Sequence, residues 1–208
     1  MIRPLLTALT FLTVLPLPLD RPPTPEEIGR STPFYPLVGG ILGLILLGVA
    51  LPLRPLGSEI AAVLTLIVWV RLTGGLHLDG LADVADARAA SPVHREKALA
   101  VMKDVHNGPA ALVAVVLTLL LKFVLIREVM LRELWWSLPA APLLARSGIV
   151  ALFLTLPYLR PEGLGAGQSS QLPKGWGWLS VALAMAFLPL AGGAAGALAL
   201  AGTAMFFL

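Results

Sequence analysis

The sequence contains no cysteine and carries little charge. Only 13% of its 208 residues are charged, whereas soluble domains carry about 25%. The absence of cysteine excludes disulfide bonds, thiolate catalysis and cysteine-based metal sites. Hydrophobic residues make up 57% of the chain, a share that indicates an integral membrane protein. We therefore predict a single integral membrane domain over residues 1–208.

Basic runs are also absent, although the net charge is +3. Nucleic-acid binding usually needs clustered basic residues, so no nucleic-acid partner is predicted. Lysine and arginine are concentrated near 20–33, 86–108 and 158–175. By the positive-inside tendency these segments face the cytoplasm. The predicted surroundings are the inner membrane of a bacterial or archaeal cell, with the lipid bilayer as partner and a homo-oligomer left open.

Apolar runs separated by prolines, glycines and charges predict an all-α, polytopic membrane helix bundle. About twenty apolar residues are needed for one full span, and we expect six or seven transmembrane helices. The first run contains Pro16 and Pro18, so it either crosses the bilayer or enters and returns. Thr24, Pro25 and the acids after them predict a helix start. The apolar runs are 1–19, 34–53, 59–72, 109–126, 134–157 and 176–208.

Aspartate and histidine are scarce, and they are concentrated in the stretch 73–108. Four of the five aspartates and all three histidines lie there. Acidic groups beside membrane-grade segments are costly unless they pair, bind a cation or face water. This contrast predicts the functional region, which contains Asp79, Asp83, Asp86, Asp104, His77, His94 and His106.

Asp79, Asp83 and Asp86 are spaced i, i+4 and i+7, which is one face of a helix. Three like charges on one face repel each other unless a cation neutralises them. Oxygen ligands favour Mg²⁺ or Mn²⁺, while His77 leaves zinc open. Mg²⁺ usually shares its coordination with substrate phosphates. The pattern therefore predicts transfer of a phosphoryl-type group; the alternative is a solvated helix face at the membrane edge.

Other charged residues are candidates for acid–base or phosphate-binding roles. Asp104 is either a further metal ligand or the base that takes a proton from an attacking hydroxyl, with His106 as the rival base. Arg146 lies in an apolar run, so it either pairs with an aspartate or holds a phosphate. Arg30 precedes the segment 34–40 and is either an interfacial anchor or a phosphate ligand.

The run from Gly74 to Asp86, GGLHLDGLADVAD, closely resembles the signature of the cobalamin synthase family, the adenosylcobinamide-GDP ribazoletransferases. Segments 10–16, 34–39 and 95–104 resemble further motifs of that family in the same order. The resemblance covers most of the chain. Its acidic signature is far more specific than a short glycine pattern.

The resemblance implies a Mg²⁺-dependent reaction. Adenosylcobinamide-GDP is joined to α-ribazole or its 5′-phosphate, giving adenosylcobalamin or its phosphate and GMP. Asp79, Asp83 and Asp86 would bind the metal and the diphosphate. The implied catalytic residues are Asp104, Asp83 and His77, and the implied phosphate-binding residues are Arg30, Arg95, Lys103 and Arg146.

Several positions depart from the family pattern. Val14, Ala87 and Val105 stand where members usually have arginine, glycine and serine. Members are also expected to carry a C-terminal GGxTGD-like acidic motif, which does not occur before Leu208. By this resemblance, either the gene is short or the sequence is truncated, and activity is expected to be impaired if the motif supplies metal ligands or the base.

Two other functions fit parts of the pattern. A CDP-alcohol phosphatidyltransferase would show a DGxxAR run, but Asp83 stands where that arginine belongs. A cation-coupled transporter would place its acids near the midplane of broken helices. Here the acids follow a span and lead into a loop, which favours an enzyme that faces the membrane surface.

Overall fold

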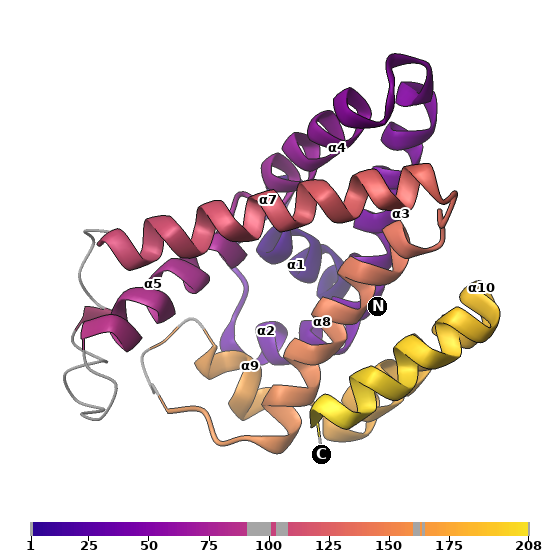
Figure 1. Ribbon diagram of the computed structural model, residues 1–208. Helices are drawn as coiled ribbons and strands as arrows, with labels where there is room; N and C mark the ends of the chain where they lie inside the picture. The colour runs from indigo at the N-terminus through magenta and orange to yellow at the C-terminus, as the bar shows by residue number, and fades with distance from the viewer. Residues whose placement is uncertain (1, 91–100, 103–107, 160–162, 164, 208) are drawn as a thin grey trace.

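Every regular element of the described chain is helical, as the sequence predicted. The computed structural model describes residues 2–90, 101–102, 108–159, 163 and 165–207 (Figure 1). Two short 3₁₀ turns, Thr32–Phe34 and Arg54–Leu56, flank one of the helices. The α-helices are α1 (Ile2–Leu12), α2 (Pro25–Ser31), α3 (Tyr35–Leu53), α4 (Ser58–Leu72), α5 (Leu76–Ala90), α7 (Pro109–Leu131), α8 (Ser137–Thr155), α9 (Ala166–Gln171) and α10 (Lys174–Phe207).

Three segments of the described chain are long and apolar enough to cross a membrane: Pro25–Leu56, Pro109–Leu131 and Ser137–Thr155. The bent pair α4–α5 makes up to four. A helical membrane bundle is thus confirmed. The prediction of six or seven spans also counted shorter or interrupted runs. Of these, α1 has 11 residues, α4 has 15, and α10 is kinked at Gly193.

The start of α2 confirms the predicted capping residues. The Thr24 hydroxyl accepts a hydrogen bond from the Glu27 amide at 3.3 Å, and the Glu27 carboxylate accepts one from the Thr24 amide at 3.0 Å. Pro25 occupies the first turn, where its missing N–H costs nothing. This capping box satisfies two amides that would otherwise have no partner in the helix.

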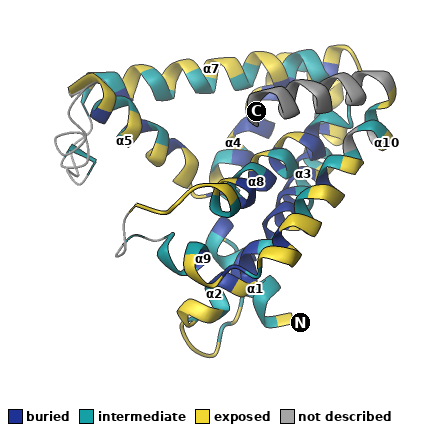
Figure 2. Cartoon of the chain, turned by 90° about the horizontal axis from the view of Figure 1, so that it is seen from below, coloured by how far each residue is buried: buried dark blue, intermediate teal, exposed yellow. Residues whose placement is uncertain are grey.

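The core is built where α3 crosses α8. Gly39 and Gly43 line the contact, and a Cβ added to either would lie 2.3 Å from α8 backbone atoms, the Pro142 oxygen and the Pro139 Cα respectively. Tyr35, which begins α3, is 1% exposed. Buried residues accordingly gather on α3 and α8, while α5 and α7 carry mainly exposed and half-buried residues (Figure 2).

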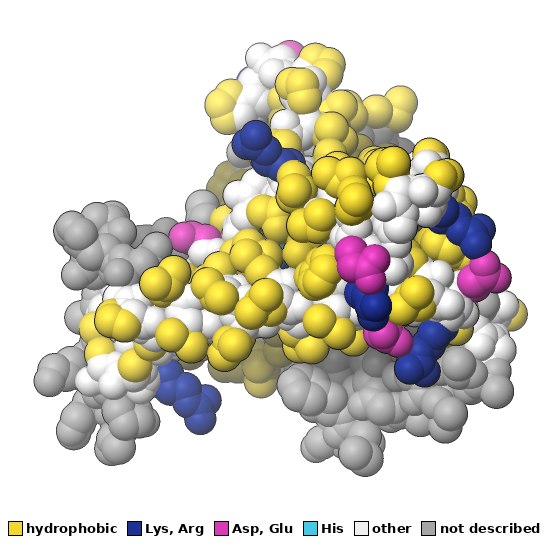
Figure 3. All heavy atoms as spheres, turned by 45° about the horizontal axis from the view of Figure 1, so that its top comes forward, with side chains coloured by type: hydrophobic (Ala, Val, Ile, Leu, Met, Phe, Trp, Pro, Cys, Tyr) yellow, Lys and Arg dark blue, Asp and Glu magenta, His cyan; other side chains and the backbone are white. Residues whose placement is uncertain are grey.

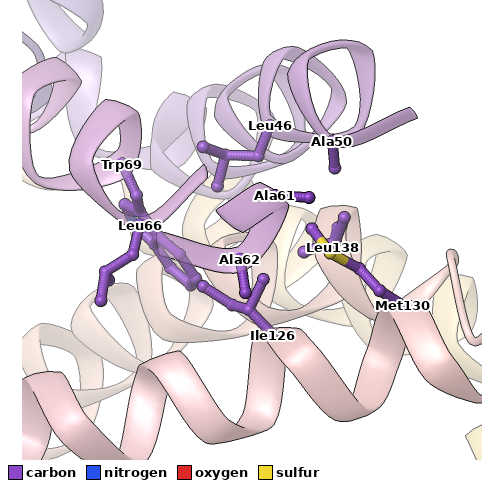
Figure 4. Close-up of a cluster of buried hydrophobic side chains, with 9 residues drawn as sticks. All are labelled: Leu46, Ala50, Ala61, Ala62, Leu66, Trp69, Ile126, Met130 and Leu138. Atoms are coloured by element: carbon purple, nitrogen blue, oxygen red, sulfur yellow. The ribbon is translucent and has the colours of Figure 1, made fainter. Parts of the chain in front are cut away.

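A second buried cluster ties α4 and α7 to this core (Figure 4). Ala61 and Ala62 of α4 are completely buried, and their small side chains bring α4 close to its neighbours. Trp69 lies about two turns further along the same face and completes the α4 contribution. The cluster also contains Leu46, Ala50, Leu66, Ile126, Met130 and Leu138.

The outward side of α7 is apolar and exposed. Hydrophobic side chains cover much of the face in Figure 3, and charged side chains gather at only a few places. In α7 the exposed apolar residues recur along its whole length, as expected for a helix in contact with lipid. They include Leu112, Val113, Val116, Leu117, Leu120, Leu121, Val124 and Leu125.

Candidate active site

A two-glycine elbow turns the chain from α4 into α5. Gly74 and Gly75 have φ angles of 62° and 71°, in the left-handed region that favours glycine. Their amides donate to the carbonyls of Arg71 and Val70, each at 3.2 Å, which closes the end of α4 as a Schellman motif. The next residues begin α5 at 85° to α4. The elbow therefore sets the direction of the acidic helix.

The three predicted metal ligands lie on α5, and they differ in their surroundings. Asp79 is exposed, while Asp83 and Asp86 are half-buried. Asp86 accepts hydrogen bonds from the amides of Gly108, at 2.5 Å, and Ala111, at 2.8 Å. Gly108 is the N-cap of α7 and Ala111 lies in its first turn, so the Asp86 carboxylate caps the start of that helix.

No protein cation pairs with Asp79 or Asp83 within the described part of the chain. These residues likewise form no group of three or more potential ligands around one metal position. The donor set nevertheless fits Mg²⁺, because this ion often takes only one or two carboxylates and completes its shell with substrate phosphates and water. The role of Asp79 and Asp83 as metal ligands stays a prediction.

A large cavity, of about 1190 Å³, lies between α5, α7, α8 and the N-terminal helices. His77 of α5 lines it, and the His77 Nε2 accepts a hydrogen bond from Lys122 Nζ at 2.9 Å. The other ring nitrogen, Nδ1, lies 3.4 Å from the Thr73 hydroxyl. Lys122 also lies 4.4 Å from the ring centre of Trp69. His77 thus joins the acidic helix to this cavity, with its basic nitrogen already engaged.

Arg146 lines the same cavity from α8. It is only 8% exposed, and its Nε has no hydrogen-bond partner. Among the described residues no carboxylate forms an ion pair with Arg146. The predicted pair of Arg146 with an aspartate is therefore not found among them. A buried guanidinium without a counter-charge is costly. The second alternative, a phosphate held by Arg146, stays a prediction.

The other predicted residues lie elsewhere. Arg30 is exposed on α2, where it pairs with Glu26 at 2.7 Å, and it does not line the cavity. Its role as a phosphate ligand stays a prediction. Five predicted residues lie outside the described part of the chain: His94, Arg95, Lys103, Asp104 and His106.

Two cavity residues were not singled out from the sequence. Lys122 is a charge inside an apolar run, which is a signal of function that could have been used. Gln168 is 1% exposed and donates from Nε2 to the Tyr35 hydroxyl at 3.2 Å. It comes from a polar loop that gives no sequence signal for burial.

The helical membrane fold, the acidic helix and the basic cavity are the features expected of a membrane-embedded transferase of phosphate-bearing groups. The sequence matches the family described as Cobalamin-5-phosphate synthase, CobS, over residues 4–208. The chain belongs to this family.

Individual relatives agree with the family match. The chain is 47% identical to an adenosylcobinamide-GDP ribazoletransferase of Pseudomonas aeruginosa, over 99% of this chain and 84% of the relative. It is 44% identical to the protein of that name from Stutzerimonas stutzeri, over 99% of this chain and 83% of the relative. No solved structure matches the chain.

Proposed function

We propose that this protein is an adenosylcobinamide-GDP ribazoletransferase that works with Mg²⁺. Its substrates would be adenosylcobinamide-GDP and α-ribazole or α-ribazole 5′-phosphate, and its products adenosylcobalamin or its phosphate together with GMP. The names of its relatives support the reaction. The observation that carries the site is α5 itself, which presents Asp79 and Asp83 directly after the elbow without a described cation partner.

The reaction breaks the phosphoanhydride bond of the diphosphate and forms a phosphate ester bond to the ribazole. A hydroxyl oxygen of the ribazole forms a bond to the cobinamide-linked phosphorus, and the bond from that phosphorus to the bridging oxygen breaks. GMP leaves with the bridging oxygen, and the hydroxyl proton passes to a base. Bound Mg²⁺ would neutralise charge on the diphosphate oxygens.

The positions of the acidic residues and of His77 suggest a separate role for each. Asp79 and Asp83 would hold the metal and through it the diphosphate. Asp83 is also a candidate base, and Asp104 is the other. His77 is less suited to that role as placed, since Lys122 already donates to its Nε2. It would instead hold Lys122 in the cavity.

The remaining charged residues complete the proposal. We propose Arg95 and Lys103 as further phosphate ligands, and Arg30 as a weaker one because it pairs with Glu26. The basic segments around them suggest an active site on the cytoplasmic face of the inner membrane.

Release of GMP tests this function. Detergent-purified protein with adenosylcobinamide-GDP, α-ribazole 5′-phosphate and Mg²⁺ should release GMP only when all three are present. Asp83→Asn should lower the rate by about a hundredfold, the size of effect seen when one group that stabilises the transition-state charge is lost. Asp20→Asn is the control, because Asp20 lies in the connection between α1 and α2, where it pairs with Arg3.

The outcome is decisive in both directions. Metal-dependent GMP release that survives in Asp20→Asn and is lost in Asp83→Asn supports the reaction and its site. Folded protein that releases no GMP with either acceptor contradicts the proposal.

A further inference from the structure

Three buried polar atoms around the large cavity have no hydrogen-bond partner. They are Arg146 Nε, Trp69 Nε1 and Gln168 Oε1, on side chains of residues that are 8%, 8% and 1% exposed. They account for three of the four such atoms found in the described chain. Buried polar atoms are nearly always paired, so their gathering around one cavity indicates a place where a ligand supplies the missing partners.

The charges that line the cavity are positive on balance. Arg132 and Glu128 both line it, but they pair with each other at 2.9 Å and so cancel. Lys122 and Arg146 are left, with Lys122 Nζ lying 2.9 Å from His77 Nε2. Two cations with no opposing carboxylate in the described residues favour an anionic ligand.

The walls between these groups are apolar and aromatic. They include Phe11, Tyr35, Leu76, Ile149 and Phe153. Binding sites for small molecules are mainly apolar, of about 300–1,000 Å³, and fix orientation with a few polar groups. This cavity reaches about 1190 Å³. The walls therefore suit a ligand whose body is large, apolar and ring-bearing.

We infer that this cavity binds a phosphate group carried on an apolar body, with Arg146 and Lys122 as its charge partners. The Trp69 indole N–H donates a further hydrogen bond to the anion, and Gln168 Oε1 accepts one from a hydroxyl or amine of the ligand. The inference rests on the proposed function, since α-ribazole 5′-phosphate has this chemistry. It assigns the acceptor to the cavity and leaves the α5 carboxylates to the diphosphate of the other substrate.

Binding without turnover tests the inference. The purified full chain is studied in an uncharged detergent, without Mg²⁺ and without adenosylcobinamide-GDP, so that the α5 carboxylates cannot contribute. Dissociation constants are measured for three probes: α-ribazole 5′-phosphate, α-ribazole and phosphatidylglycerol. The variants are Arg146→Met and Lys122→Met. The control is Arg71→Met, because Arg71 is exposed and does not line the cavity.

We expect the wild-type protein to bind α-ribazole 5′-phosphate at least about tenfold more tightly than α-ribazole, the gain of one charge-assisted hydrogen bond. Arg146→Met and Lys122→Met should each remove most of that preference and leave α-ribazole binding unchanged. Arg71→Met should behave as wild type. Equal binding of the two ribazoles, or equal preference in Arg146→Met and wild type, would overturn the inference.

The lipid probe distinguishes two sources of the same chemistry. If phosphatidylglycerol binds with the same dependence on Arg146 and Lys122 while α-ribazole 5′-phosphate does not, the anion site stands and its ligand is a lipid headgroup. If neither probe depends on these residues, the inference fails.

Folding does not obscure the result. An unpaired buried charge contributes nothing favourable to the empty protein, so Arg146→Met should unfold at the same temperature as wild type or higher. A lower unfolding temperature of the empty variant would show that Arg146 is structural and would count against the inference. Absence of GMP release with intact phosphate preference would instead contradict only the proposed reaction.

Discussion

The contact between α3 and α8 and the arm formed by α5 and α7 are built in opposite ways. In the contact, a methyl group at Gly39 or Gly43 would overlap the backbone of α8. In the arm, a methyl group at Gly80 would meet nothing within 4 Å, and only Leu78, Ala82 and Ala87 of α5 are buried. The chain therefore has a close-packed scaffold, the α3–α8 contact, and a sparsely packed arm, α5 and α7. The arm carries Asp79, Asp83 and Asp86.

The largest expected effect would break the scaffold. In Gly43→Ala the new Cβ lies 2.3 Å from Pro139 Cα, and backbone cannot give way as a flexible side chain can. We expect a loss of roughly 3 kcal/mol or more in folding free energy, seen as a fall in yield and in unfolding temperature in detergent. Gly48→Ala is the matched control on the same helix, where the Cβ meets nothing and alanine should add up to about 1 kcal/mol. Similar behaviour of the two variants would contradict the close-contact argument.

The next effect comes from the elbow. Gly75→Ala places nothing within 4 Å of the new Cβ, so it tests only the left-handed backbone, at a cost of about 1–2 kcal/mol. Any relaxation of this strain changes the direction of α5, so GMP release should fall more than stability does. Gly80→Ala, in the open and helical part of α5, should leave the unfolding temperature unchanged or raise it. A fully active Gly75→Ala would show that the elbow does not set the site.

Asp86 offers a way to separate a structural from a metal-binding role. Asp86→Ala removes the acceptor for two amides at the start of α7 and should cost about 1 kcal/mol, as for other lost caps. Asp86→Asn keeps one acceptor oxygen and should recover most of that loss in thermal unfolding. If capping is its whole role, the Asn variant should need the same Mg²⁺ concentration as wild type for half-maximal GMP release. A large rise in that concentration would make Asp86 a metal ligand.

The smallest effect lies at the C-terminal end of α7. Glu133 has a φ of 55° and ends α7 with the same Schellman pattern that Gly74 and Gly75 give α4. Glu133→Gly should stabilise the protein by up to about 1 kcal/mol by relieving that backbone strain. Glu133→Gln, which removes only the exposed pair with Arg54, should change stability by less than about 0.5 kcal/mol. A destabilised glycine variant would mean that the ion pair outweighs the strain.

Local features of this chain could be predicted, and long-range ones could not. The capping box of α2 and the helical placement of the α5 aspartates depend on residues within one or two turns, so spacing alone was enough. Asp86 meets amides 22 and 25 residues away, and Gln168 meets Tyr35 across 133 residues. Such contacts depend on how the helices pack, which hydrophobic periodicity does not specify.

The candidate site shows the same division. Asp79, Asp83 and Arg146 were identified because a charge is conspicuous in an apolar sequence. The partnership of Lys122 with His77 needs α5 and α7 to lie side by side, as they do in Figure 1, and no sequence spacing reports it. The short first helix agrees with the prolines at 16 and 18, since α1 ends at Leu12 while the apolar residues continue.

The elbow also constrains the length of the chain. Each residue of an α-helix turns the next by about 100°. One residue inserted between Gly75 and Leu76 would therefore rotate every face of α5 and turn the Asp86 carboxylate away from the start of α7. An insertion of seven residues is close to two full turns and would nearly restore the original rotation of α5. The connection at 16–23 carries no helix and has no such phase to keep. Insertions and deletions should consequently be tolerated between α1 and α2 and selected against at the elbow.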